Sequence, residues 1–406
     1  MTSAACRSCG AGDLEVVLSL GRTPLANALL TKEQLDEPEE TYPLELAFCP
    51  RCSLVQLTET IPPERLFREY LYFSSFSDTM VRHAHDLAHE LIATRKLDES
   101  SLVVEVASND GYLLQFYKAA GIPVLGIEPA ENVARSAREE RGIPTLAEFF
   151  GMPLADRIVA EGRRADVLHA HNVLAHVADL NGFVAGIARV LLPNGIAVIE
   201  VPYVKDMLDR CEFDTIYHEH LCYFSATALE RLFARHGLEL EDIERVPIHG
   251  GSLRLTAGRG ERSARVHALL EEEAAWGVDS IETYRGFAQR VDRLKRSLRE
   301  TLAGVKERGA RVAAYGAAAK GSTLLNCFGI GSETLDFVVD RSTYKQGRYM
   351  PGVHLPIHPP EKLLEDRPDY VLLLTWNFAD EIIAQQEAYR RVGGKFIVPV
   401  PEPQVV

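Results

Sequence analysis

Short runs rich in Val and Ile alternate with helix-like segments through the middle of the chain. The β-branched runs predict buried strands at 101–106, 123–127, 165–170 and 195–201. Between and before them, helical periodicity predicts helices at 81–95, 112–120, 130–141 and 180–191. Strand and helix in turn imply a parallel sheet that helices cover on both faces.

The pattern changes twice towards the carboxyl end. Shorter segments at 248–258 predict antiparallel strands, and the charge-rich helical stretch 260–308 favours a solvated connector over a binding role. A second alternating unit begins at Arg311 and continues through LDFVVD and DYVLLLTWN to FIVPV. We therefore expect an α/β fold with two separate sheets. The expected domains are 1–65, which ends close to the Pro62-Pro63 pair, 66–245 and 246–406.

Composition describes an ordinary globular chain. The 406 residues are 46% hydrophobic, which is ample for several cores. A basic segment followed by an apolar run is missing at the amino terminus, and no apolar run approaches about eighteen residues, so we expect a soluble, cytoplasmic protein without a membrane partner. The net charge of −14 argues against a protein that coats a phosphate backbone, so a nucleic acid partner is not expected.

Four of the seven cysteines form two pairs with the same spacing, Cys6 and Cys9 in CRSC and Cys49 and Cys52 in CPRC. Each gap lets both thiolates reach one tetrahedral ion, and four sulfurs leave no position open, which predicts structural zinc. The insert between the pairs exceeds that of a compact zinc ribbon. Two disulfides or chance clustering are the alternatives, and a reducing compartment favours the metal. The other cysteines are expected to be free thiols: Cys211, Cys222 and Cys327.

An acidic turn, EVASNDG at 105–111, follows the first strand of the expected sheet. It holds one glycine of the three in a dinucleotide fingerprint, and it places acceptors where a pyrophosphate needs donors, so NAD is disfavoured. S-adenosylmethionine has cationic groups and no phosphate, so an acidic turn is complementary to it. Glu128 closes the next strand, where a carboxylate can accept from ribose hydroxyls. The alternative is a turn in which Asn109 or Asp110 only caps a helix. The expected cofactor residues are Glu105, Ser108, Asn109, Asp110, Gly111, Glu128 and Asn172.

Histidines concentrate after two of the expected strands: His169, His171 and His176 at the end of 165–170, then His218 and His220 in YHEH at 217–220, after 195–201. Removing a proton beside a ketone requires a base with a pKa near neutrality, which histidine supplies. In an extended segment His218 and His220 would share one side, so a two-histidine metal site is an alternative. Histidines that are hydrogen-bonded in the core are another.

A second glycine-containing turn, YGAAAKGS at 315–322, combines small residues, a lysine and a helix start, which suits a diphosphate. Lys320 and Ser322 are the expected contacts, and a tight turn in a packing domain is the alternative. Later loops of the same unit add lower-ranked candidates: Asp340, Lys345, Trp376 and Asn377. His249 and Arg254 are expected to face the crevice between domains, without an assigned chemistry.

Together these motifs resemble the nucleotide-sugar C-methyltransferases that make branched deoxysugars for antibiotics. The resemblance covers essentially the whole chain through CRSC with CPRC, PLANALL, YLYFSS, EVASNDGYLL, NVLAHV, YHEHLCYFS, HGGSLR and YGAAAKG, in that order. It implies a small zinc-binding amino-terminal module, a central Rossmann-like S-adenosylmethionine (SAM) methyltransferase domain and a second Rossmann-like α/β domain that holds the sugar nucleotide.

The resemblance also implies a reaction. Its substrate is a 4-keto sugar linked to thymidine diphosphate (dTDP), methylated most often at C-3. His220 is implied as the base, with Tyr72, His176, Tyr217 and Glu219 lining the same pocket, and Tyr217 or Tyr72 can donate to the ketone oxygen. A zinc-containing RNA methyltransferase and a non-catalytic assembly module are the rivals; the missing basic stripe argues against the first, and intact Asp110, Glu128 and His220 against the second. A monomer or small homo-oligomer is expected.

Overall fold

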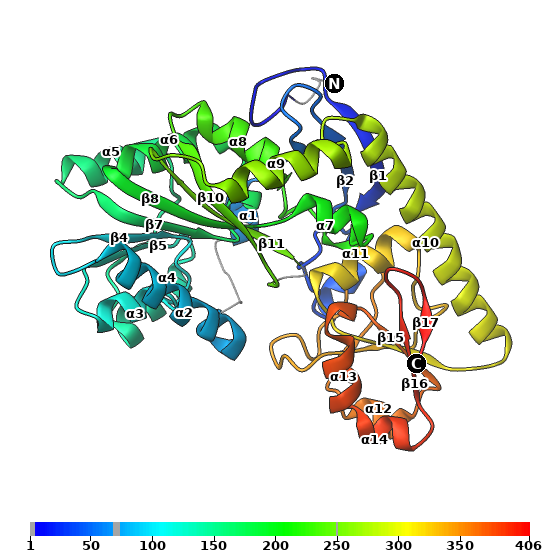
Figure 1. Cartoon of the computed structure of the whole chain (residues 1–406). Coiled ribbons are helices and arrows are strands. Elements are labelled where there is room, and N and C mark those ends of the chain that lie inside the picture. Colours follow the sequence, from blue (N-terminus) through cyan, green and yellow to red (C-terminus); the bar gives the residue numbers. More distant parts are fainter. Residues whose placement is uncertain (1–4, 68–73, 249–250) are drawn as a thin grey trace.

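The computed structural model describes residues 5–67, 74–248 and 251–406. Within these ranges the chain forms three sheets of four, seven and six strands, which Figure 1 shows as three connected parts of one molecule. Tyr72 and His249, which the sequence singled out, lie outside the described residues. The two sheets predicted from alternation are therefore present, with a smaller amino-terminal sheet beside them.

The amino-terminal sheet is antiparallel and has the order β1-β2-β3-β9. Three of its strands come from the amino-terminal module: β1 (Glu15–Thr23), β2 (Tyr42–Phe48) and β3 (Val55–Leu57). The fourth, β9 (Cys222–Tyr223), comes from the central part of the chain and pairs with β3 through Val55 and Gln56. A short helix, α1 (Pro63–Phe67), ends the module. This sheet therefore holds the end of the YHEHLCY segment in place.

The central sheet has the order β10-β11-β8-β7-β4-β5-β6. Its parallel strands are β4 (Val103–Val106), β5 (Val124–Ile127), β6 (Thr145–Leu146), β7 (Ala165–His171) and β8 (Leu191–Pro202). The remaining strands are β10 (Glu239–Val246) and β11 (Ser252–Gly258), and β11 runs antiparallel to both of its neighbours, β8 and β10. Strand β11 lies beyond the expected boundary at 245/246 and pairs with both β8 and β10, so the central sheet extends past that position.

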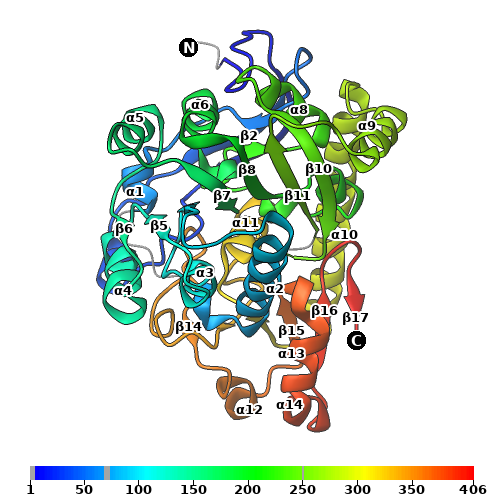
Figure 2. The ribbon, with the colours of Figure 1, turned by 60° about the vertical axis from the view of Figure 1, so that its left-hand side comes forward.

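Helices cover both faces of the central sheet, as Figures 1 and 2 show. One face carries α2 (Asp78–Arg95), α3 (Leu114–Ala119) and α4 (Glu131–Arg141); the other carries α5 (Met152–Ala160), α6 (Leu180–Val190) and α8 (Ala226–Ala234). Alternate residues of β4 point to opposite faces, so Val103 packs with the α2 and α3 cluster while Val104 and Val106 join the opposite one. A further helix, α9 (Ala264–Trp276), packs beside α8 and β10.

The carboxyl-terminal sheet has the order β14-β13-β12-β15-β16-β17. Parallel strands β12 (Val312–Tyr315), β13 (Val338–Val339), β14 (Ile357–His358), β15 (Tyr370–Leu373) and β16 (Lys395–Val398) form most of it, and β17 (Gln404–Val405) is antiparallel. Its helices are α11 (Ala319–Phe328), α12 (Lys362–Asp366), α13 (Ala379–Gln385) and α14 (Glu387–Arg391). Strand, glycine turn and helix follow one another from β12 into α11, as the sequence predicted.

The long helix α10 (Ile281–Glu307) runs along one side of the molecule from the central part to the carboxyl-terminal sheet (Figure 1). The prediction of a solvated connector is only half right, because one side of α10 is buried at Tyr284, Phe287, Val291, Leu294, Leu298, Leu302 and Val305. This stripe shares one core with residues of β1, β2 and β12, and the Tyr284 and Phe48 rings stack 4.5 Å apart. Among the described residues, every helix is too short or too polar to cross a bilayer.

Candidate active site

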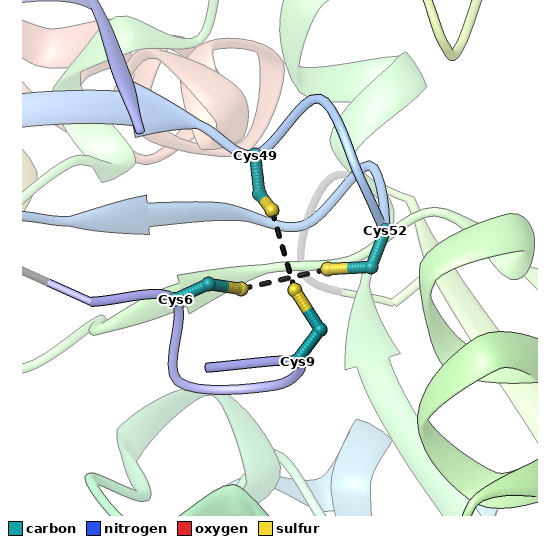
Figure 3. A group of neighbouring side chains, drawn as sticks. All are labelled: Cys6, Cys9, Cys49 and Cys52. Carbon is teal, nitrogen blue, oxygen red and sulfur yellow. Dashed lines mark hydrogen bonds between the residues drawn. The ribbon is translucent and has the colours of Figure 1, made fainter. Parts of the chain in front are cut away.

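The four paired cysteines come together at one point beside the amino-terminal sheet (Figure 3). The Sγ atoms of Cys6 and Cys52 lie 3.5 Å apart, as do those of Cys9 and Cys49, and all four lie within 4.8 Å of one another. A disulfide needs about 2.05 Å, which excludes that alternative, whereas four sulfurs at about 2.3 Å from a tetrahedral ion are separated by roughly 3.8 Å. The donor set fits zinc and closes its coordination sphere.

Both cysteine knuckles have the same backbone conformation. In the first, the Cys6 N–H donates to the Ala11 carbonyl (2.8 Å) and the Gly10 N–H donates to the Cys6 carbonyl (2.9 Å). Cys49 repeats both bonds with Leu54 and Ser53 at 2.9 Å. Gly10 and Ser53 share a positive φ, 74° and 60°, which closes each turn. Each pair thus lies on the same kind of turn, and the sulfurs of both turns point to one site (Figure 3).

A cavity of about 920 Å³ lies where the three parts of the molecule meet. Its lining includes Asn27 from the amino-terminal module, the acidic turn and histidines of the central part, and Phe378 from the carboxyl-terminal part. The predicted site residues that line it are Asn109, Glu128, Asn172, His176, Tyr217, Glu219, His220, Lys320 and Asn377. The cavity thus brings together residues from each of the three groups predicted for cofactor, chemistry and substrate.

The acidic turn after β4 has an unusual backbone. Ala107, Asn109 and Gly111 all have positive φ, 57°, 49° and 79°, so alternate residues adopt the left-handed conformation that the single glycine did not reveal. Asn enters this region easily, whereas for Ala it costs roughly 1–2 kcal/mol. A Cβ on Gly111 would lie 2.9 Å from Ile143, so packing also requires glycine there. Ala107 and Asn109 line the cavity, where the turn exposes its backbone to a ligand.

Glu128 ties the two turns at this end of the cavity together. Its Oε2 accepts from the Asn109 N–H (3.0 Å) and its Oε1 from the Ala130 N–H (2.9 Å). Burial raises the pKa of this carboxyl, while the two backbone bonds favour the ionised form. Each oxygen keeps a lone pair for a ribose hydroxyl. The position predicted from the sequence, directly after β5, is thus a fixed acceptor in the cavity wall.

Other residues of the predicted cofactor set brace the turn from behind. The Asp110 carboxylate accepts from Ser75 and pairs with Arg141 (Oδ2 to Nη2, 3.3 Å), so Asp110 is not a helix cap. Ser108 is buried against Gly126, where an added Cβ would lie 2.6 Å from Ser108 Oγ. Glu105 is buried, and neither of its oxygens has a hydrogen-bond partner among the described residues. Burial, with the charges of Asp110 and Glu128, holds the pKa of Glu105 well above its usual range.

The YHEH segment forms a turn and not the extended strand considered from the sequence, because the His220 N–H donates to the Tyr217 carbonyl (2.8 Å). Nδ1 of His220 lies 2.8 Å from the Thr215 carbonyl oxygen, which can only accept. In the neutral ring Nδ1 therefore carries the hydrogen, and Nε2 accepts from the Tyr217 hydroxyl at 2.9 Å. This tautomer, assigned from the partners, leaves Nε2 as the basic atom in the cavity.

The other histidine of YHEH points away from this site. Nε2 of His218 lies 3.1 Å from the Pro43 carbonyl oxygen, and the His218 ring packs edge-on against Tyr42. His176 takes its place beside His220, with ring centroids 4.9 Å apart, and its Nδ1 lies 2.7 Å from the Glu219 carbonyl oxygen. The turn therefore separates His218 from His220, and a metal site built from those two has no support.

His169 and His171 lie within β7 and join a buried polar chain. Nδ1 of His169 lies 2.9 Å from Nε2 of His171, whose Nδ1 lies 3.0 Å from Oε2 of Glu200. The other Glu200 oxygen accepts from Arg254 (2.7 Å) and contacts His83. Arg254 thus lies on the central sheet, bonded to Glu200, and the expectation that it faces the crevice between domains is not met.

Lys320 stands at the start of α11 with its Nζ buried and without a hydrogen-bond partner among the described residues. Nζ lies 3.9 Å from Oε2 of Glu212 and 5.1 Å from the centroid of the Trp376 ring. Trp376 donates to Asp214 Oδ2 (2.7 Å). Burial raises the pKa of Glu212 to about 7, with Lys320 opposing that shift. An anion that entered here would meet one buried cation beside a readily protonated carboxyl.

The other predicted substrate residues of the second turn brace it. Asp340 Oδ2 accepts from the Ala317 N–H (2.8 Å), and Lys345 Nζ donates to the Ala317 carbonyl (2.9 Å). Ser322 is buried within α11. These three residues and Trp376 are absent from the described cavity lining, and Asp340 and Lys345 support the backbone that leads to Lys320.

Some lining residues were missed from the sequence. Phe149 follows β6, lines the cavity and is 44% exposed, an unusual fraction for a large aromatic side chain. Phe150, Glu148 and Met152 line the same stretch. The adjacent aromatics of EFFGM were the available signal. PLANALL, one of the motifs that carry the resemblance, contains Asn27, but neither Asn27 nor Glu212 was expected as a site residue, because each reaches the cavity only through the packing of the three parts.

Comparison with known proteins agrees with this architecture. Three family models match: a zinc binding domain at 6–67, a methyltransferase domain at 80–243 and a C-methyltransferase C-terminal domain at 247–401. C-methyltransferase NovU from Streptomyces niveus is 38% identical over 405 residues, which cover 99% of this chain and 96% of NovU. The ubiquinone biosynthesis O-methyltransferase of Methylobacterium sp. (strain 4-46) is 26% identical over 175 residues, which cover 39% of this chain and 67% of that protein.

Among solved structures, magnesium protoporphyrin IX methyltransferase (ChlM) from Synechocystis PCC 6803 with bound SAM is 13% identical and has a TM-score of 0.34; the match covers 44% of this chain and 79% of that one. The extended identity with NovU, together with the three family matches, spans every part of the fold. The chain therefore belongs to the C-methyltransferase family and is a SAM-dependent methyltransferase with a structural zinc site in its amino-terminal module.

Proposed function

We propose that this enzyme methylates a carbon atom, C-3, of a dTDP-linked 4-keto deoxysugar, in the making of a branched sugar for an antibiotic. The observation that carries the proposal is the Tyr217–His220 pair, which lines the same cavity as Asn109 of the acidic turn and Lys320 and in which Nε2 of His220 is the basic atom. The whole-length similarity to NovU supports transfer to carbon.

In this proposal the donor lies along the acidic turn, and bound SAM supplies an electrophilic methyl group. Glu128 accepts from its ribose hydroxyls, and the stretch 148–152 packs its aromatic side chains on the adenine ring. Asn109 and Asn172 complete the wall on the donor side. The acidic character of this wall suits a cationic donor.

The proton at C-3 moves to Nε2 of His220, and the C–H electron pair becomes part of an enolate whose charge collects on the ketone oxygen. Tyr217, once its hydroxyl leaves Nε2, donates to that oxygen, where charge develops only during the reaction. The carbon then takes the methyl group as the sulfur–methyl bond breaks. Holding both reactants aligned contributes roughly 7–11 kcal/mol at the limit.

The carboxyl-terminal part holds the nucleotide in this scheme. Lys320 pairs with the diphosphate, and Asn377 and Phe378 line the neighbouring wall. Zinc takes no part in the chemistry, because four thiolates close its coordination sphere.

The variant His220→Asn tests the proposal. We expect it to bind SAM like the native enzyme in calorimetry and to lose methyl transfer to a dTDP-linked 4-keto sugar, because Asn cannot take the proton. Near-normal turnover would exclude His220 as the base. Failure of the native enzyme to bind SAM, or to methylate any such sugar, would overturn the proposed function itself.

A further inference from the structure

The zinc-binding module contributes one polar side chain to the candidate active site. Asn27 lies in the loop between β1 and β2 and lines the cavity. Its Nδ2 donates to Oε1 of Glu219 at 2.7 Å, across 192 residues of sequence. This bond joins the amino-terminal module to the segment that carries His220.

Both partners of this bond are held by backbone pairing. On one side, Leu30 and Tyr349 exchange two backbone hydrogen bonds (3.0 and 2.9 Å), so the loop with Asn27 is fixed to the carboxyl-terminal part. On the other side, the Leu57 N–H donates to the Leu221 carbonyl (2.9 Å), next to the β3–β9 pairing. The Asn27–Glu219 contact is therefore set by the assembly of the molecule and not by a mobile side chain alone.

The contact gives the two oxygens of Glu219 different roles. An amide N–H can only donate, so Oε1 must accept. Glu219 is buried in the cavity wall, and burial raises the pKa of its carboxyl, with Asn27 opposing that shift. When the carboxyl is protonated, its hydrogen belongs on Oε2, because Oε1 is already engaged as an acceptor.

We propose that Asn27 is a positioning residue that keeps Oε1 of Glu219 as an acceptor, so that the Oε2 hydroxyl donates to the oxygen of the sugar ketone. The role at the ketone rests on the proposed function. It adds a second donor to Tyr217 at the atom on which negative charge develops. It also explains why a zinc-bound module is built against the catalytic turn.

The activity test uses two substitutions of Asn27 in the zinc-loaded enzyme. Asn27→Ala should lower kcat about 10- to 100-fold, with an unchanged Kd for SAM. Asn27→Asp should lower kcat near neutral pH, and its kcat as a fraction of the native value at the same pH should recover in part as the pH falls. The ionised carboxylate that this second variant introduces would draw the Glu219 proton onto Oε1, and protonation of the pair would restore the hydroxyl at Oε2. A merely structural contact would give no such recovery.

Asn181 supplies a matched control. Its Nδ2 donates to the carbonyl oxygens of Arg7 (2.9 Å) and Ser8 (3.0 Å), so it also joins the module to the central part, but Asn181 is not among the described residues that line the cavity. Asn181→Ala should leave kcat and its pH profile near native. Equal losses in Asn27→Ala and Asn181→Ala would show that docking of the module alone matters and would overturn the proposal.

Infrared spectroscopy tests the positioning without any sugar. A protonated carboxyl band that disappears in Glu219→Gln should shift to higher wavenumber in Asn27→Ala, because the C=O group loses a hydrogen bond. No shift would overturn the inference about Asn27. If the band shifts in Asn27→Ala but the native enzyme does not methylate such sugars, the proposed function and the role at the ketone are overturned instead.

Discussion

The hydroxyl of Tyr217 lies 2.9 Å from Nε2 of His220, on the imidazole whose other nitrogen is bound to the Thr215 carbonyl. One backbone oxygen thereby fixes which nitrogen of His220 is basic, and the tyrosine marks where that nitrogen points. Because Tyr217 and His220 both line the cavity, they form a ready pair for moving a proton.

Replacing Tyr217 by Phe removes the hydroxyl and keeps the ring. We expect kcat to fall about 100-fold, because the developing charge on the substrate oxygen loses a donor, while SAM binding stays native. Single-turnover methyl transfer and calorimetry with SAM measure the two effects. A native kcat in Tyr217→Phe would remove this tyrosine from the chemistry and leave Glu219 and Tyr72 to be tested as donors.

Removing zinc should affect the candidate active site although zinc lies outside it. The cysteine cluster anchors the sheet in which β3 pairs with β9, next to the YHEH turn. We expect a chelating dye to release about one zinc per chain, to lower Tm by several degrees and to abolish methyl transfer, because a structural zinc site contributes on the order of 10 kcal/mol to folding. Added zinc should restore both, and unchanged activity in metal-free enzyme would contradict this link.

Glu273 tests the packing of α8 against α9. It is fully buried and accepts from the Ala226 N–H (2.7 Å), the Thr227 N–H (2.8 Å) and the Thr227 hydroxyl (2.6 Å), which satisfies the start of α8. Glu273→Ala should lower the free energy of unfolding by about 3 kcal/mol, because several buried donors lose their acceptor. Glu271→Ala, on the exposed side of the same helix, should change it by less than about 0.5 kcal/mol in urea unfolding. Equal effects would contradict this capping role.

Glu212 gives a pH dependence with a definite sign. Burial raises its folded pKa from 4.5 to about 7, so the folded protein keeps a proton that the unfolded chain has lost. Its contribution to stability is complete below about pH 4.5 and is lost as the pH rises through 7. As the pH rises from 5 to 8, the free energy of unfolding of Glu212→Gln should therefore increase relative to that of the native protein by up to about 3 kcal/mol. Thermal unfolding at a series of pH values measures this difference. The stability of Glu99→Gln, a substitution at an exposed position, should depend on pH as that of the native protein does. The same pH dependence in Glu212→Gln would contradict the raised pKa of Glu212.

Local sequence was sufficient where a motif and its fold lie in one segment. The cysteine pairs, Glu128 at the end of β5 and Lys320 at the start of α11 follow from spacing and from strand–turn–helix order. The buried side of α10 could also have been predicted from the sequence, since its apolar residues recur every three or four positions.

Other features depended on tertiary packing, which local periodicity does not specify. The β3–β9 pairing and the Asn27–Glu219 bond each join residues more than 160 positions apart. The placement of β11 between β8 and β10 depends on sheet order and not on its own pattern. The left-handed Ala107 was unreadable because alanine is not the residue that this conformation prefers.

The position of the transferred methyl group tests the central claim most directly. The native enzyme should be incubated with SAM carrying ¹³C in its methyl group and with a dTDP-linked 4-keto deoxysugar, and the product examined by NMR. The account predicts one labelled methyl group bonded to ring carbon C-3, with long-range coupling to the neighbouring ketone carbon. A label on oxygen or nitrogen, or SAM that binds and transfers nothing to such sugars, would contradict it.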